Sequence, residues 1–409
     1  MVLSRALGIE LGIHMRFASA YSLLEDTADA ASTSVKALIE KLGAAPDLLL
    51  LYATENHATD ALIASVRAAS PGTPIIGSTS CGGVMTEAGF HSGQAGAMGV
   101  LGISDPGGAY GVGSADLADD PFSGGARAIE EALAASGRDF ESPVIVWCCQ
   151  PPGREEAVLA GIQSVIGRHT PIIGGSSADE QIAGKWREFS TEGVLTDHVV
   201  VAVWFPTITH GTAFESGYAP TGLSGTVTRA EGRQVFEIDG LSASEVYSDW
   251  TNGDVPASQT GMILAQSTPT PLGRLAGEAG GVPMFVLSHP AMIGQAGELS
   301  LFTDIEEGDQ VMLMRGSPES LVKRAAVVVD DACAAGGWAR DETRGGLVIY
   351  CGGCMLHVRD RMDEVAQHVS RTMHGAPFLG AFTFGEQGAI VDSSNRHGNL
   401  MVSGLMFGG

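Results

Sequence analysis

The chain has little positive charge and no long apolar run. Lys and Arg total 23 against 47 Asp and Glu, which gives a formal net charge of −24 over 409 residues. A nucleic acid or an anionic membrane would mostly be repelled by such a surface. No stretch approaches the roughly 18 uninterrupted apolar residues of a membrane-spanning helix. We therefore expect no nucleic-acid partner and no membrane partner.

Cysteine is scarce, and the first residues do not form a secretion signal. Six cysteines in 409 residues are too few for a disulfide scaffold, so reduced thiols in a cytoplasm are expected. Near the start, Glu10, His14 and Arg16 interrupt the apolar stretch that a signal core requires. We predict a cytoplasmic protein whose first strand covers Met15–Tyr21.

Several common catalytic motifs are missing. Gly184 and Lys185 are followed by Trp186, so no phosphate-binding P-loop is built, and neither His-Glu-x-x-His nor Gly-x-Ser-x-Gly occurs. Cys351 and Cys354 form one Cys-x-x-Cys pair without a second pair at zinc spacing, and Met355 stands where c-type haem attachment needs His. We predict no metal site and no resident cofactor, although spacing alone leaves non-covalent haem open.

Glycine, in contrast, is abundant, and the chain repeats one order of signals. Its 56 glycines are about twice the ordinary 7% share. A short apolar strand, an amphipathic stretch and a strand that opens with Pro occur three times, and another apolar run follows each copy. The opening strands and the Pro-initiated strands are 48–53 with 74–80, 144–149 with 171–177, and 347–351 with 377–386.

This order predicts an α/β fold. A strand, a helix and a second strand form a right-handed parallel crossover, and the following strand returns antiparallel. We therefore expect mixed sheets built from repeated strand-helix-strand-strand units in two modules, residues 15–215 and 216–409. Between the second and third units, residues 211–340 differ: they indicate hairpins, a short helix over Leu241–Trp250 and a longer helix over Ser317–Ala335.

The Pro-initiated strands end in small and hydroxyl-bearing residues. A glycine stands three residues after each Pro, where a side chain would block close backbone approach. In open α/β sheets, ligands bind at the carboxyl ends of the strands. Tight turns capped by Ser are the alternative interpretation. The candidate ligand-binding residues of these loops are Ser78, Thr79, Ser80, Cys81, Ser176 and Ser177.

The third unit adds two further candidates. Cys351 and Cys354 stand at the end of a predicted buried strand, where a thiol at a helix amino end is activated. Their possible roles are redox sensing, ligand contact and nucleophilic attack. The alternative is that they are small buried apolar residues. Glu386 ends an apolar run, where a carboxylate either caps backbone N–H groups or binds a ligand's cation. Asn399, before the last strand, faces Glu386 across a predicted hairpin.

These residues resemble the FIST (F-box and intracellular signal transduction) family over about residues 15–407. The segment Ile76–Gly82 is similar to the family's amino-terminal signature, and Cys351, Glu386 and Asn399 match its carboxyl-terminal module. Many relatives carry Arg after the Cys-containing turn, where this chain has Cys354. The resemblance implies a cytoplasmic sensory module that feeds a histidine kinase, a cyclic-nucleotide signalling protein or a chemotaxis receptor.

We therefore predict a non-enzymatic small-ligand sensor that signals through a separate partner, with an amino acid as a candidate ligand. The serine loops would hold the carboxylate of this ligand and Glu386 its ammonium group. The first alternative is a haem-binding nitric-oxide sensor with His357 as iron ligand. The second is an enzyme that uses Cys351 or Cys354 as nucleophile.

Overall fold

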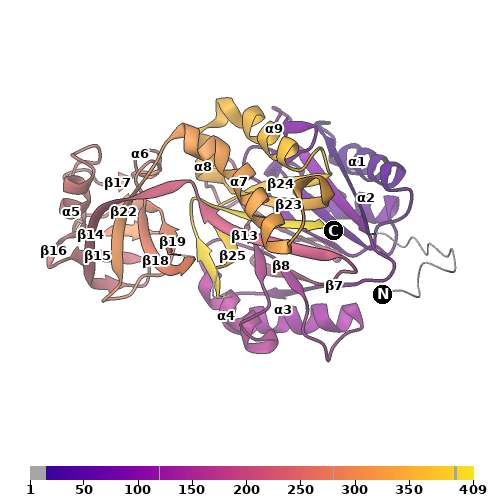
Figure 1. The fold of residues 1–409 in the computed structure, drawn as a ribbon, viewed down its shortest axis with the longest axis horizontal. Helices are drawn as coiled ribbons and strands as arrows, with labels where there is room; N and C mark the ends of the chain where they lie inside the picture. The colour runs from indigo at the N-terminus through magenta and orange to yellow at the C-terminus, as the bar shows by residue number, and fades with distance from the viewer. Residues whose placement is uncertain (1–14, 119, 280, 391–393) are drawn as a thin grey trace.

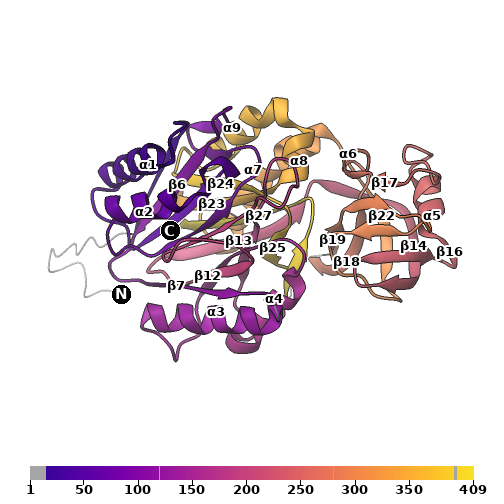
Figure 2. The same ribbon diagram turned by 180° about the vertical axis from the view of Figure 1, so that it is seen from behind.

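The computed structural model describes residues 15–118, 120–279, 281–390 and 394–409. An α/β body carries a smaller lobe, residues 217–316, on one side (Figures 1 and 2). The lobe is inserted between β13 and α7 of the body. None of the described helices is long and apolar enough to cross a membrane.

The body contains three structural repeats. The first repeat comprises β1 (Arg16–Ser22), α1 (Thr27–Leu42), β2 (Leu48–Ala53), α2 (Asp60–Ala69), β3 (Ile75–Thr79), β4 (Val84–Thr86), β5 (Gly89–His91) and β6 (Met98–Ser104). The second comprises β7 (Ala109–Asp116), α3 (Pro121–Ser136), β8 (Ile145–Gln150), α4 (Glu155–Ile166), β9 (Ile172–Ser176), β10 (Glu188–Ser190), β11 (Val194–Leu195) and β12 (His198–Phe205). The third comprises β13 (Thr209–Ser216), α7 (Pro318–Gly336), β23 (Thr343–Cys351), α8 (Gly352–His357), α9 (Met362–Thr372), β24 (Phe378–Thr383), β25 (Glu386–Ala389), β26 (Asn395–Gly398) and β27 (Met401–Gly408).

Each repeat builds a mixed sheet, as the sequence predicts. The pairs β2–β3, β8–β9 and β23–β24 are parallel, and β6, β12 and β27 pair antiparallel with the first strand of each pair. The α/β fold class with mixed sheets is confirmed. The expected first strand is also present, as β1.

The hairpin of every repeat leaves its own sheet and joins a neighbouring one. β4–β5 pairs with β24, β10–β11 with β3, and β25–β26 with β9. The three six-stranded sheets consequently have the same order: β1-β6-β2-β3-β10-β11, β7-β12-β8-β9-β25-β26 and β13-β27-β23-β24-β4-β5. This cyclic exchange ties the three repeats into one body.

The strands divide their apolar residues between two layers of core. Successive side chains of a strand point to opposite faces. Leu50, Trp147 and Ile349 enter a central core that all three sheets share. Their neighbours Leu49 and Val146 instead pack under helix pairs, α1 with α2 and α3 with α4. α7 and α9 cover the third sheet in the same way.

The first helix of each repeat is delimited by local sequence signals. An N-cap side chain accepts a backbone N–H at its start, and a left-handed glycine stands at its end. The N-caps are Asp26, Asp120 and Ser317, and the C-terminal glycines are Gly43, Gly137 and Gly337.

Two glycines of the Pro-initiated strands are required by backbone approach. A Cβ at Gly77 would lie 1.6 Å from the carbonyl oxygen of Leu51, and a Cβ at Gly174 would lie 1.9 Å from that of Cys148. Both strands therefore pack against their parallel neighbour in a way that only glycine allows. This close approach agrees with the sequence expectation.

The described residues of the lobe form a nine-stranded antiparallel sheet and two short helices. Its order is β17-β20-β21-β15-β14-β22-β18-β19, and β16 pairs with β15. The elements are β14 (Tyr218–Glu231), β15 (Gln234–Ile238), β16 (Leu241–Ser242), α5 (Ala243–Trp250), β17 (Gly261–Met262), α6 (Leu264–Ser267), β18 (Leu272–Ala279), β19 (Val282–Ser288), β20 (Pro290–Ile293), β21 (Leu299–Leu301) and β22 (Gln310–Gly316). The proposed module boundary at 215/216 lies at the end of β13, where the chain enters this lobe, and the division into two modules stays a prediction.

Candidate functional site

The ends of β3, β9 and β24 meet in the centre of the body. The N–H of Cys81 donates to the carbonyl of Phe382 (2.9 Å), that of Ala178 to Thr79 (3.1 Å), and that of Phe384 to Ser176 (3.1 Å). Each bond joins equivalent positions of two repeats, and together they close a cycle. We call residues 79–81, 176–178 and 382–384 the strand-end ring.

The hydroxyl groups at these strand ends already have partners in the protein. Ser80 Oγ donates to Gly83 O at 2.7 Å and accepts the N–H of Phe382 at 2.8 Å. Ser176 Oγ donates to Glu155 Oε1 at 2.9 Å, and Ser177 Oγ donates to Glu188.

The backbone amides are used in the same way. The N–H of Thr79 donates to Arg187 O, that of Ser80 to Ala53 O, and that of Ser177 to Gln150 O. The structure thus brings the predicted serine loops together as the sequence suggests, but in the interior and hydrogen-bonded to one another. Their role as ligand contacts stays a prediction. The fully buried candidates are Ser78, Thr79, Ser80, Cys81, Ser176 and Ser177.

Glu386 is also enclosed. Oε1 accepts the hydroxyl of Thr383 at 2.9 Å, and Oε2 accepts the N–H of Met401 at 3.0 Å. Burial, and next the neighbouring Cys351, raise the pKa of Glu386 well above its usual range. The neutral carboxyl is therefore favoured, and its partners are those of a structural group.

The two cysteines of the third repeat are buried thiols. Cys351 is the last residue of β23, Cys354 lies in α8, and the hydroxyl of Tyr218 is 3.6 Å from the Sγ of Cys354. Burial, and then the neighbouring Cys354, raise the pKa of Cys351 well above the usual value. Burial also raises the pKa of Cys81 to about 12. A high pKa favours the thiol over the nucleophilic thiolate.

A cavity of about 550 Å³ lies where the body meets the lobe. The body contributes the loop after β8, the segment before β10, α8 and the turn after β24. The lobe contributes α6 and three single side chains. The lining residues are Pro152, Gly153, Glu155, Ile182, Trp186, Cys351, Gly353, Leu356, His357, Phe384 and Asn399 from the body, and Arg233, Leu264, Ala265, Thr268, His289 and Phe302 from the lobe. We call it the interlobe cavity.

Much of the wall of the interlobe cavity is aromatic. The rings of Trp186 and Phe384 pack edge to face with centroids 6.1 Å apart, and Phe302 lies 6.1 Å from the ring of His289. The Nε2 of His289 is 3.1 Å from the carbonyl oxygen of Leu264. Burial lowers the pKa of His289 to about 4, so this imidazole is neutral at physiological pH.

The other part of the wall is charged. Arg233 of the lobe contacts Glu155 at 2.7 Å, Glu156 at 2.7 Å and Asp304 at 2.9 Å. Glu155 has only 1% of its side chain exposed and also accepts the N–H of Gly153 at 3.0 Å. Arg233 therefore joins the lobe to the start of α4 through a buried ion pair.

His397 completes this charged group. Its Nδ1 lies 3.1 Å from Glu156 and its Nε2 3.6 Å from Glu155. Burial alone would lower the pKa of His397, but Glu155 and Glu156 outweigh burial and raise it. Burial alone would likewise raise the pKa of Glu156, but His397 and Arg233 hold it well below its usual range. Donor atoms of the two acids and the imidazole lie within 4.8 Å, close enough for a metal ion, yet Arg233 already contacts both carboxylates.

Sequence reasoning found part of this cavity. Cys351, Asn399 and His357 line it, and the N–H of His289 donates to Oδ1 of Asn399 at 3.3 Å. Glu155 was missed, although it follows the Pro-Pro-Gly turn at the carboxyl end of a predicted strand, where the same strand-end rule applies. Arg233 gives no signal in the sequence, because only the fold brings it to Glu155.

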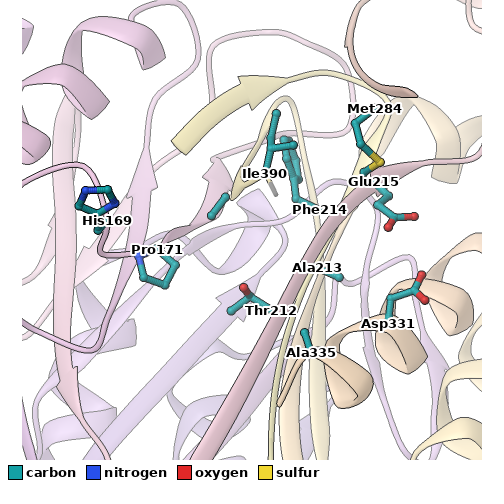
Figure 3. Close-up of a pocket in the computed structure, with 11 residues that line it drawn as sticks. His169, Pro171, Thr212, Ala213, Phe214, Glu215, Met284, Asp331, Ala335 and Ile390 are labelled. Carbon is teal, nitrogen blue, oxygen red and sulfur yellow. The ribbon is translucent and has the colours of Figure 1, made fainter. Parts of the chain in front are cut away.

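A smaller cavity of about 330 Å³ lies between β13, α7 and the end of β25. Glu215 and Asp331 stand on one side of it and His169 on the other (Figure 3). Glu215 is paired with Arg324. Burial raises the pKa of Asp331. Its lining comes mainly from the body, and Met284 of β19 is the lobe residue among the described lining residues.

Comparison with known proteins identifies the family. The FIST N domain matches residues 47–241 and the FIST C domain matches residues 243–389. The chain belongs to the FIST family.

One curated relative matches a short segment of the chain, and several solved structures match most of it at low sequence identity. An uncharacterized protein of Methanocaldococcus jannaschii is 35% identical over 88 residues, 21% of this chain and 17% of the relative. The chain thus matches less than a fifth of that relative's length. Cyanuric acid hydrolase from A. caulinodans has a TM-score of 0.37 at 12% identity, covering 96% of this chain and 99% of the hydrolase. PurLQS from Thermotoga maritima has a TM-score of 0.24 at 10% identity, covering 97% of this chain and 72% of that one.

Proposed function

We propose that this protein is a cytoplasmic small-ligand sensor whose ligand binds in the interlobe cavity. Domains of this family are associated with signal transduction and the sensing of small ligands. The observation that carries the proposal is the cavity of about 550 Å³ with an aromatic wall and a charged wall. Its size falls within the roughly 300–1,000 Å³ of small-molecule sites. An amino acid, or another small organic molecule with an apolar body and a polar head, suits such a site.

The position of the cavity offers a way to signal. Trp186 and Phe384 belong to the body, whereas Arg233 and Phe302 belong to the lobe, so a bound ligand contacts both parts. A ligand that binds one relative position of the two parts better than another shifts the population toward it. A separate partner would read this shift; a histidine kinase or a cyclic-nucleotide signalling protein is the candidate that the family resemblance suggests.

Thermal unfolding and calorimetry with a panel of amino acids, related acids and amines test this function. A ligand at 100 times its dissociation constant should add about 2.7 kcal/mol to the free energy of unfolding. Trp186→Ala should weaken binding of any hit by about tenfold or more, because the contact between the indole ring and the ligand is lost. Phe140→Ala, at a fully exposed side chain outside the cavity, is the control. A flat melting temperature over the panel, or equal affinity in both variants, contradicts the proposal.

His357 favours a second candidate, a haem-based gas sensor. This residue lies on α8 and lines the interlobe cavity, whereas the other histidine there, His289, has its Nε2 directed at Leu264. His357 would supply an axial nitrogen, and haem would supply the site for a diatomic gas. Titration of the protein with haemin should then give a Soret band that His357→Ala shifts or removes. A protein that leaves the haemin spectrum unchanged rejects this candidate.

Cys351 lines the cavity, so the alternative of an enzyme with a cysteine nucleophile can be tested at this residue. A nucleophilic Cys351 would react with iodoacetamide faster than free cysteine at neutral pH. Burial and the raised pKa of Cys351 favour a slow reaction instead. We therefore propose that the chain binds its ligand without covalent chemistry.

A further inference from the structure

The charged group at one wall of the interlobe cavity has an excess of acid. Glu155 and Arg233 line the cavity itself, whereas Glu156, Asp304 and His397 stand behind them and line a neighbouring cavity of about 480 Å³. Three carboxylates, of Glu155, Glu156 and Asp304, surround the single guanidinium of Arg233 and the imidazole of His397. Even with His397 protonated, the group keeps a net negative charge. The protein as a whole adds to this field, since its formal net charge is −24.

Arg233 is poorly placed to offset this charge for an anionic ligand. Its Nη2 contacts Glu155 and Glu156, and its Nε contacts Asp304. A ligand carboxylate that approached the guanidinium would stand beside three protein carboxylates. A nearby opposite charge stabilises a buried charged group, whereas a nearby like charge destabilises it. This wall, with its excess of carboxylates, therefore suits a cation.

Among the described residues that line the cavity, none besides Arg233 carries a fixed positive charge. Burial makes His289 neutral and favours the thiol form of Cys351. His357 also lines the cavity, and its side chain is exposed to solvent. The aromatic faces of Trp186 and Phe384 add a second interaction with a cation, because the electron-rich face of a ring attracts an ammonium group.

We propose that the interlobe cavity takes an aromatic or otherwise apolar amine, whose cationic head lies at Glu155 and which carries no carboxylate. This inference rests on the proposed function and narrows its ligand class. An amino acid would have to place its own carboxylate near the acidic wall, while the backbone amides of the strand-end ring are engaged within the protein.

Four probes with one skeleton test the charge of the head: tryptamine (cation), tryptophan (zwitterion), indole-3-propionate (anion) and 3-ethylindole (neutral). Dissociation constants are measured with the full chain by calorimetry and ligand-observed NMR at pH 8 and low salt. We expect tryptamine to bind about tenfold or more tightly than 3-ethylindole, and indole-3-propionate to bind most weakly. Added salt should reduce the advantage of tryptamine, because screening weakens charge interactions.

Substitutions of the acidic residues test whether they cause the preference for tryptamine over 3-ethylindole. Asp304→Asn removes one charge without changing a side chain that lines the cavity, and should reduce the tryptamine preference severalfold. Glu155→Gln should reduce it further. Glu237→Gln, an exposed acid of the same lobe paired with Arg229, is the charge-matched control and should leave the preference unchanged.

The outcomes separate this inference from the proposed function. If 3-ethylindole or indole-3-propionate binds as tightly as tryptamine, and Trp186→Ala weakens that binding, the cavity is a ligand site without cation preference. If none of the four probes binds while an acid or an amino acid of the wider panel does, the amine inference fails and the sensor function stands. If no compound binds at all, both fail.

Discussion

The strand-end ring and the interlobe cavity use the carboxyl ends of strands in opposite ways. In the ring, the ends of β3, β9 and β24 face one another, and their hydroxyls and amides form hydrogen bonds across the repeats. In the cavity, the end of β23 and the loop after β8 face the inserted lobe instead. Strand ends that hydrogen-bond to neighbouring strand ends contribute to the stability of the fold. Strand ends that face a separate lobe leave space for a ligand.

The two regions also differ in how they balance buried charge. Neither Glu386 nor Glu188, near the ring, forms an ion pair within the described residues. Burial raises the pKa of both and, at Glu188, outweighs the nearby Arg187, so the neutral forms are favoured. Glu155 and Glu156, at the cavity, are held by Arg233 and His397. The free energy of unfolding should therefore depend on pH because of the buried acids near the ring. At the cavity, it should depend on the charged partners of Glu155 and Glu156.

The largest expected effect concerns Glu188, which is fully buried in β10 and accepts the hydroxyl of Ser177. Burial raises its pKa to about 8 from a usual 4.5, so between these pH values the folded state holds a proton that the unfolded state has lost. The free energy of unfolding therefore falls as pH rises through this window, by up to about 1.4 kcal/mol per pH unit.

Glu188→Gln should remove this component from a series of urea titrations between pH 5 and 8. Glu192→Gln, at an exposed acid of the adjacent turn, should keep the wild-type profile. Identical pH profiles for Glu188→Gln and the wild type would show that Glu188 is ionised in the folded protein, and would remove this difference between the two regions.

Arg233→Ala should have the next largest effect. It leaves the buried Glu155 without its cation, and loss of one partner from a buried pair costs about 3 kcal/mol in free energy of unfolding. Arg229→Ala, in the exposed pair with Glu237, should cost no more than about 0.5 kcal/mol. Urea unfolding compares the two. Equal costs would mean that the charged wall contributes little to joining body and lobe.

Glu386→Ala should have the smallest effect of the three, about 2 kcal/mol, because the Met401 N–H and the Thr383 hydroxyl lose their acceptor. Glu386→Gln keeps acceptor and shape and should cost less than about 1 kcal/mol. Both variants should bind a cavity ligand with unchanged affinity. A folded Glu386→Ala protein that no longer binds would make the strand-end ring part of the ligand site.

Local signals were sufficient to predict the repeated architecture. Each of β3, β9 and β24 follows a Pro, has a glycine three residues after that Pro and has an apolar pattern. These signals lie within a few residues of one another, so the sequence pattern predicts the strands directly. The same reasoning placed Asn399 across a hairpin from Glu386; the structure contains this hairpin, with Gly398, the residue before Asn399, paired with Glu386. It did not find that the hairpins are exchanged between repeats, because strand pairing across a hundred or more residues leaves no local pattern.

The candidate site could be predicted only in part, for the same reason. A serine after a strand gives the same sequence pattern whether its hydroxyl faces a ligand or a neighbouring loop. The bonds of Ser80 to Gly83 and of Ser177 to Glu188 therefore could not be predicted from the sequence. Asn399 and Cys351 were found because they stand at strand ends that do line the cavity. The partner of Glu155 could not be found, since Arg233 is 78 residues away in the chain.

The sequence by itself determined the family, through the resemblance of its motifs. It also determined the α/β class and the order of the elements, because periodicity and capping act over a few residues. Tertiary structure alone decided which polar groups are satisfied and which wall keeps excess charge. Those properties depend on distances between segments that meet only after the hairpins have been exchanged and the lobe has packed against the body.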